Sequence, residues 1–215
     1  MEHTSYLSGG KSIGLSYHAS AEASQPAILL LHGAGGVDAG HNYVQQLAAS
    51  LSVGGYATYI LEYFDRTDTT YASHSVIQEN FALWLRTIAD AVSFIADQPH
   101  IDPARIGTLG YSLGGALAVA HAAEDLRVRA TVELAGTLEP EQASQLLRLP
   151  PLLIIHGEQD RRVPFSRAVE LERLAWSLGG LVETAYYPDE RHVLSSVATL
   201  QAFTRALLFF DRHLV

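Results

Sequence analysis

The residues best suited to chemistry form the stretch Gly110-Tyr111-Ser112-Leu113-Gly114-Gly115. The apolar run from Arg105 to Leu109 before it is predicted to be a buried strand, and the small residues from Ala116 onward favour a helix. A serine between these elements lies on a sharp strand-to-helix turn, and the small glycines beside it leave room for the bend. The serine hydroxyl then faces substrate, and the free N–H groups of the helix N-terminus face a developing oxyanion. The pattern predicts a nucleophile elbow.

A simple glycine turn would produce the same pattern, but an acid and a histidine farther along the chain favour catalysis. Asp160 ends the polar loop after the apolar run 152–155, and His192 follows the next predicted strand, Val182 to Tyr187. Serine, acid and histidine therefore occur in the chain order of α/β-hydrolases. We predict Ser112 as the nucleophile, His192 as the general base and Asp160 as the acid that orients the histidine. Glu133, which ends the strand after the elbow, is the alternative acid.

A second glycine-rich loop, His32 to Gly36, follows the predicted buried strand from Pro26 to Leu31. This is the position from which an α/β-hydrolase supplies its second oxyanion donor, so we predict the backbone N–H groups of Ala34 and Leu113 as the oxyanion hole. The loop lacks the third glycine of a dinucleotide fingerprint, and no Lys-Ser/Thr pair follows it. The ten histidines show no metal-ligand spacing. No cofactor and no metal are therefore predicted.

Residues near the carboxyl ends of the predicted strands are expected to line a substrate pocket. They are Gly33, Glu62, Tyr63, Arg66, Tyr111 and Glu133. For the segment 62–66, a solvated loop braced by an ion pair of Asp65 or Arg66 is an equally good interpretation. Three other histidines, His41, His74 and His121, are expected on helix surfaces or at the pocket rim.

The elements that must position these residues alternate between strand and helix, which favours a mostly parallel sheet with helices on both faces. An N-terminal hairpin around Gly9-Gly10 is predicted to precede them. The other predicted strands lie at 27–31, 56–61, 105–109, 130–134, 152–156 and 182–187, and the predicted helices lie at 43–53, 76–98, 113–123, 141–148, 164–178 and 195–213. The longest connection, 63–75, is too short for a separate cap, so one α/β-hydrolase domain is expected over residues 1–215.

Composition limits the partners of this chain. The 215 residues are 48% hydrophobic, enough for one sizeable core, and carry a net charge of −9. Without a basic stripe, no nucleic acid partner is expected, and without a long apolar run or a signal sequence, no membrane segment is expected. Cysteine is absent, which excludes disulfides. We expect a cytoplasmic protein that is a monomer or homodimer and takes a small-molecule ester or lactone.

The chain resembles the dienelactone hydrolase family from about Pro26 onward. The resemblance rests on the elbow and on three further motifs: Tyr63-Phe64-Asp65-Arg66-Thr67, Ile101-Asp102-Pro103-Ala104-Arg105-Ile106-Gly107 and His156-Gly157-Glu158-Gln159-Asp160. It implies an α/β-hydrolase fold with little or no cap and a hydrolytic activity. Members that give the family its name have a cysteine where this chain has Ser112 and a glutamate where it has Gly33.

These two differences favour a serine esterase that cleaves small, short-acyl esters or lactones through an acyl-enzyme on Ser112. Three alternatives remain. They are a dienelactone hydrolase proper, a peptidase or acyltransferase with the same triad, and a non-catalytic homologue that only binds ligand.

Overall fold

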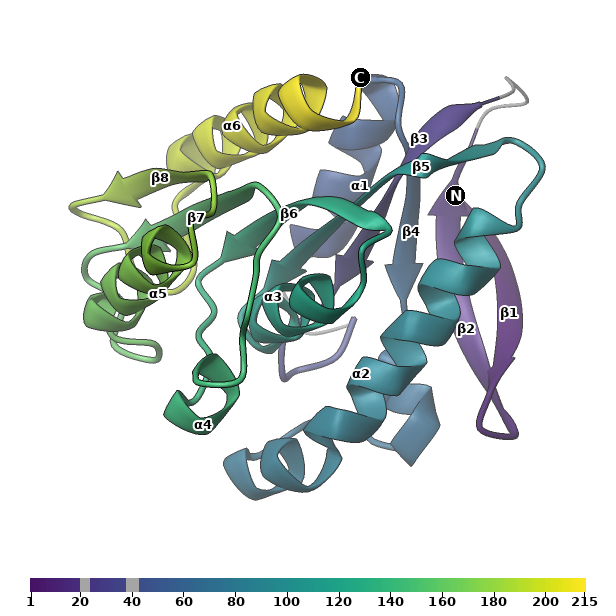
Figure 1. The fold of residues 1–215 in the computed structure, drawn as a ribbon, viewed down its shortest axis with the longest axis horizontal. Coiled ribbons are helices and arrows are strands. Elements are labelled where there is room, and N and C mark those ends of the chain that lie inside the picture. The colour runs from purple at the N-terminus through teal and green to yellow at the C-terminus, as the bar shows by residue number, and fades with distance from the viewer. Residues whose placement is uncertain (20–23, 38–42) are drawn as a thin grey trace.

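The structure is a computed structural model that describes residues 1–19, 24–37 and 43–215. Within these residues, eight strands form one sheet in the order β1-β2-β4-β3-β5-β6-β7-β8 (Figure 1). They are β1 (Glu2–Ser8), β2 (Lys11–His18), β3 (Gln25–Leu31), β4 (Ala57–Leu61), β5 (Ile101–Tyr111), β6 (Val128–Leu134), β7 (Leu152–Gly157) and β8 (Val182–Tyr187). β2 pairs antiparallel with β1 and β4, and the other neighbours pair in parallel. The predicted α/β fold is confirmed.

Helices cover both faces of the sheet (Figure 1). They are α1 (Tyr43–Val53), α2 (His74–Ala96), α3 (Leu113–Glu124), α4 (Pro140–Ala143), α5 (Phe165–Ser177) and α6 (Ser196–Leu214), with a 3₁₀ helix η1 (Tyr63–Thr67). One apolar core joins the sheet to α2, α3 and α5, and a second joins it to α1 and α6. Because both faces are covered, β3, β4 and β7 are buried along their whole length, as expected of parallel strands.

Local signals in the sequence start two of the long helices. The hydroxyl of Ser73 accepts a hydrogen bond from the Val76 N–H at the start of α2, and Ser195 does the same for Ala198 at the start of α6. Among the described helices, none is both long and apolar enough to cross a lipid bilayer.

Two segments differ from the predicted elements. The helix expected over 141–148 is only the short α4, Pro140–Ala143. The chain beyond α4 packs against the end of α3 instead of continuing the helix. There, Arg148 donates hydrogen bonds to the carbonyls of Ala122 and Ala123, which lie in the last turn of α3. The 3₁₀ helix η1 was not predicted, since five residues carry too little periodicity to reveal a helix.

Candidate active site

Ser112 lies between β5 and α3 on a strained turn. It is the N-cap residue of α3 and has a φ of 56°, a conformation that side-chain-bearing residues rarely adopt. Glycine is required on both sides of it: a Cβ at Gly110 would overlap the Gly114 carbonyl, and a Cβ at Gly114 would overlap the Leu31 carbonyl. The sequence therefore forms a sharp elbow because only glycine allows β3, β5 and α3 to approach so closely.

Three side chains meet at the carboxyl end of the sheet. The Oγ atom of Ser112 lies 3.1 Å from Nε2 of His192, and Nδ1 of His192 lies 2.7 Å from Oδ2 of Asp160. His192 and Asp160 are both buried. The structure thus brings the three residues predicted as nucleophile, base and acid into one hydrogen-bonded chain, although they are 80 and 32 residues apart in sequence.

Backbone contacts hold the acid and position the loop that carries the base. Asp160 Oδ1 accepts hydrogen bonds from the N–H groups of Arg162 and Val163, at 2.8 and 3.0 Å. The segment before His192 passes directly over Gly157, where a Cβ would lie 2.5 Å from the Glu190 carbonyl. Because Gly157 has no side chain, the loop after β8 approaches the end of β7 and delivers the imidazole to Asp160.

The two predicted oxyanion donors flank the serine. Leu113 is the first residue of α3, and the N–H groups of Leu113 and Ala34 have no acceptor among the described residues. Two hydrogen bonds hold the loop that carries Ala34. The carbonyl of Ala34 accepts from the Ala72 N–H at 2.8 Å, and the hydroxyl of Tyr63 donates to the carbonyl of His32 at 2.7 Å. Ala34 lines the same cavity as Ser112, and Leu113 follows Ser112 in the chain, so the predicted role of these two N–H groups stays compatible with their positions.

A cavity of about 650 Å³ opens over Ser112 and His192. Its lining includes the predicted residues Gly33, Ala34, Tyr111, Ser112 and His192. It also includes residues that sequence reasoning missed, notably Tyr43, Gln45, Tyr71 and Arg162. Arg162 had a readable signal, since it lies two residues after Asp160 in the same short loop. Its side chain is exposed and forms no hydrogen bond or ion pair with any residue that the structure describes.

Three residues expected in the pocket lie outside the lining of this cavity. Tyr63 is fully buried, and its ring stacks on His32 at 4.0 Å. Glu62 and Arg66 lie over the β1–β2 hairpin instead, because Arg66 packs against Gly9 and Glu62 against Gly14. Asp65 accepts a hydrogen bond from the Gly14 N–H at 2.8 Å, so among the described residues the segment 62–66 is held on β2 by a hydrogen bond to the backbone and not by the ion pair that the alternative interpretation expected.

Glu133 also lies outside the cavity lining, and Asp160 occupies the acid position beside His192 in its place. Glu133 is fully buried beneath α3, where it accepts a hydrogen bond from the Gly136 N–H. Of the three histidines placed at surfaces or rims, His41 lies outside the described residues, whereas His121 is buried in α3. Among the described residues, no group of three or more His, Asp or Glu side chains is arranged to hold a metal ion.

The fold and this constellation of residues define a hydrolase of the α/β class. The sequence profile of the dienelactone hydrolase family matches residues 15–199. The chain belongs to this family.

Comparison with individual proteins gives more distant matches. An uncharacterized peptidase of Bacillus subtilis, YuxL, is 24% identical over 234 aligned residues, which cover 90% of this chain and 35% of that protein. The chain thus spans about a third of the length of this curated relative. Among solved structures, a dienelactone hydrolase-like promiscuous phosphotriesterase from metagenomic libraries has a TM-score of 0.85 at 17% identity, covering 100% of this chain and 98% of that one.

A further match is the acylaminoacyl peptidase of Pyrococcus horikoshii, with a TM-score of 0.78 at 19% identity, covering 99% of this chain and 41% of that one. At such identities, the two solved structures show a shared fold alone.

Proposed function

We propose that this protein is a serine hydrolase that cleaves small carboxylic esters or lactones through an acyl-enzyme on Ser112. The observation that carries the proposal is the hydrogen-bonded chain from Ser112 through His192 to Asp160, at 3.1 and 2.7 Å. It lies at the base of a cavity and beside two free backbone N–H groups. This arrangement matches the nucleophile, base, orienting acid and oxyanion donors that acyl transfer requires.

The proposed reaction begins when Ser112 Oγ attacks the substrate carbonyl carbon and its proton passes to Nε2 of His192. Asp160 accepts from Nδ1 of His192 and so holds the tautomer whose Nε2 is free to take the proton. The N–H groups of Ala34 and Leu113 stabilise the oxyanion, by about 3 kcal/mol for each well-placed donor. His192 then protonates the leaving oxygen as its bond to carbon breaks, and a water molecule hydrolyses the acyl-enzyme by the same steps.

The cavity supports small substrates. Its volume of about 650 Å³ is in the middle of the range typical of small-molecule sites. A long acyl chain finds little apolar enclosure there, so we expect esters of about two to six acyl carbons to be preferred and no activation by lipid interfaces.

The direct test is covalent labelling with a fluorophosphonate, followed by mass spectrometry to locate the labelled residue. We expect the label on Ser112, and we expect Ser112→Ala to lose both labelling and turnover while it unfolds at an unchanged temperature. Turnover is measured on a panel of p-nitrophenyl esters, lactones and amides. A label on Ser195 or Ser196 would remove Ser112 from the role of nucleophile. An unlabelled but folded protein would favour a homologue that only binds ligand.

A peptidase is the second candidate, because the Bacillus subtilis relative that aligns with 90% of this chain is named as a peptidase. The same triad cleaves amides if an amine leaves in place of an alcohol. Peptide p-nitroanilides in the same panel separate the two: a kcat/KM on an anilide above that on the matched ester would replace the esterase proposal.

A further inference from the structure

A carboxyl group that the proposed mechanism does not use lies directly beneath the nucleophile elbow. Glu133 is fully buried, and one of its oxygens, Oε1, accepts a hydrogen bond from the Gly136 N–H. The other oxygen, Oε2, is buried without a hydrogen-bond partner among the described residues. Buried carboxyl groups are costly in the charged form unless they are paired, so this site calls for an explanation.

Two glycines make room for this carboxyl. A Cβ at Gly136 would lie 2.8 Å from Glu133 Oε1, and a Cβ at Gly115, in the first turn of α3, would lie 3.2 Å from it. A Cβ at Gly136 would also lie 2.6 Å from the carbonyl oxygen of Ser112. The Glu133 side chain therefore fills a space between the turn after β6 and the first turn of the elbow helix.

The turn that Glu133 closes is strained and touches the nucleophile. Ala135 has a φ of 55°, which is unfavourable for a residue with a side chain. The carbonyl just before it, that of Leu134, accepts a hydrogen bond from the Ser112 N–H at 2.8 Å. This hydrogen bond joins the turn directly to the backbone of Ser112.

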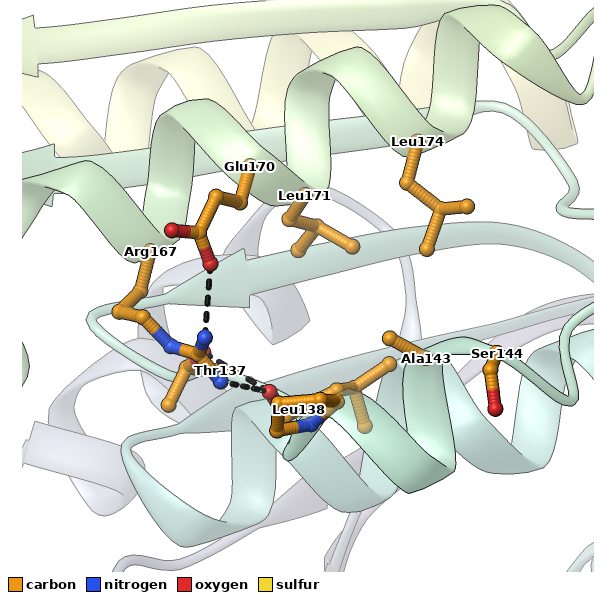
Figure 2. A pocket seen from close by; sticks show the side chains of 9 residues that line it. Thr137, Leu138, Ala143, Ser144, Arg167, Glu170, Leu171 and Leu174 are labelled. Carbon is orange, nitrogen blue, oxygen red and sulfur yellow. Dashed lines mark hydrogen bonds and ion pairs between the residues drawn. The ribbon is translucent and has the colours of Figure 1, made fainter.

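The far side of the same turn is clamped by α5. Figure 2 shows Arg167 reaching across a cavity of about 250 Å³ to Thr137 and Leu138, the residues that follow the turn. The guanidinium donates to Thr137 Oγ1 at 3.2 Å and to the Leu138 carbonyl, and it pairs with Glu170 at 2.7 Å. Arg167 is thus already paired with Glu170, and Glu133 holds the other side of the turn through the Gly136 N–H.

Charges around Glu133 do not favour a carboxylate. Among the described residues, the ionisable groups that interact electrostatically with Glu133 are Asp160, in the loop after β7, and Tyr186, on β8. The β5 partner of Glu133 is Gly110, and the first two turns of α3 carry no ionisable side chain. Burial raises the pKa of Glu133 to about 8, and the negative charge of Asp160 adds to this effect. The hydrogen bond from the Gly136 N–H acts in the opposite direction and lowers the pKa.

We propose that Glu133 is a positioning residue that works as an uncharged carboxylic acid: it fixes the turn 134–136 against the elbow, and its ionisation at alkaline pH disables the site. The inference rests on the proposed function, because the elbow matters only if Ser112 reacts. Once Glu133 loses its proton, the buried carboxylate has a single hydrogen-bond donor and gains free energy if water reaches it. Hydration of the carboxylate requires the turn 134–136 to move away from Ser112. Above pH 8, the nucleophile and the oxyanion donor beside it therefore lose their alignment.

The test compares kcat/KM from pH 6 to pH 10 on a short p-nitrophenyl ester, with spontaneous hydrolysis subtracted. For the wild type, we expect a fall of about fivefold between pH 8 and pH 9, as a single ionisation near pH 8 requires. Glu133→Gln keeps the acceptor for Gly136 and cannot ionise, so it should stay within about threefold of the wild type at pH 7 and show no such fall. The exposed Glu141→Gln is the matched control and should follow the wild-type profile.

Infrared difference spectra of the wild type and Glu133→Gln give a readout that needs no turnover. We expect the C=O band of a protonated carboxylic acid at pH 7 and its loss by pH 9.5. A decline that persists in Glu133→Gln, a Gln variant that does not fold, or no acid band at pH 7 would each overturn the proposal. If the wild type hydrolyses no ester, the proposed function fails, while the band still reports the charge state of Glu133.

Discussion

His156 Nε2 lies 3.4 Å from Oδ2 of Asp160, the same oxygen that accepts the hydrogen bond from His192. Both side chains are fully buried. Burial lowers the pKa of His156. The hydrogen bond to the Val163 carbonyl and the charge of Asp160 act in the opposite direction, but burial is the larger effect. His156 is therefore a neutral donor to Val163, at 3.0 Å, and braces the loop that holds the acid.

This brace predicts the effect of removing it. His156→Leu leaves the Val163 carbonyl without its donor and should lower the free energy of unfolding by about 1–3 kcal/mol, as expected for an unsatisfied buried acceptor. We also expect kcat to fall with little change in KM, because Val163 and its neighbour donate to Asp160. His156→Gln can place a side-chain N–H near the same carbonyl and should recover part of both losses. Urea denaturation and steady-state kinetics check this, and equal losses in the two variants would contradict it.

Replacing the acid should separate Asp160 from Glu133. Asp160→Asn removes the acceptor that selects the reactive tautomer of His192, and we expect kcat to fall by about 10⁴. Glu133→Gln at pH 7 should cost little by comparison. The measurement is kcat on one ester for both variants, and a loss of only a few-fold for Asp160→Asn with a large loss for Glu133→Gln would reverse the assignment.

The cation at the pocket mouth predicts a substrate preference. Arg162 lines the cavity with Ser112 and has no acidic partner among the described residues, so an ester that carries a carboxylate gains an ion pair there. Arg162→Gln should lower kcat/KM on p-nitrophenyl hemisuccinate by about tenfold, equivalent to about 1.4 kcal/mol, and affect p-nitrophenyl acetate much less. The two esters are assayed on both proteins, and an equal loss on both would assign Arg162 to the loop structure rather than to substrate charge.

A buried histidine predicts sensitivity to acid. Burial lowers the pKa of His32 from 6.5 to about 4, against its hydrogen bond to the Gly33 carbonyl, which raises it. The unfolded chain therefore binds more protons between these values, so the contribution of His32 to stability is complete above pH 6.5 and is lost as pH falls toward 4. For a shift of this size, the loss amounts to about 3 kcal/mol.

His32→Asn tests this contribution, since its amide can still donate to Gly33 but does not titrate. We expect the free energy of unfolding to fall less between pH 7 and pH 4 for the variant than for the wild type, by urea denaturation at each pH. Parallel pH dependences would show that other groups cause the acid sensitivity.

The elbow and the order of its partners were readable from the sequence because local rules determine them. Gly110 and Gly114 mark the elbow through close backbone contacts, and Asp160 and His192 each follow an apolar run that reads as a strand. The end of a predicted strand places the following loop at the carboxyl end of the sheet, but the direction of each side chain in that loop depends on packing. The sequence predicts Tyr63 in the pocket for that reason, whereas the ring of Tyr63 stacks on His32 in the core.

The pocket residues that were missed share the same cause. Tyr43 begins α1, and Tyr71 lies just before α2, so their places over Ser112 follow from how these helices pack on the sheet and not from any local pattern. Likewise, the helix expected over 141–148 has suitable residues, but its end is set by the bonds of Arg148 to α3. Contacts between distant segments decided each of these cases.

The position of His192 has a consequence for the order in which the site assembles. His192 lies in the loop between β8 and α6, and α6 packs into the second core, whereas the serine turn lies between β5 and α3. Undocking of α6 would therefore displace the base while leaving the serine turn in place. The rate at which a phosphonate labels protein refolding from urea should then follow the docking of α6.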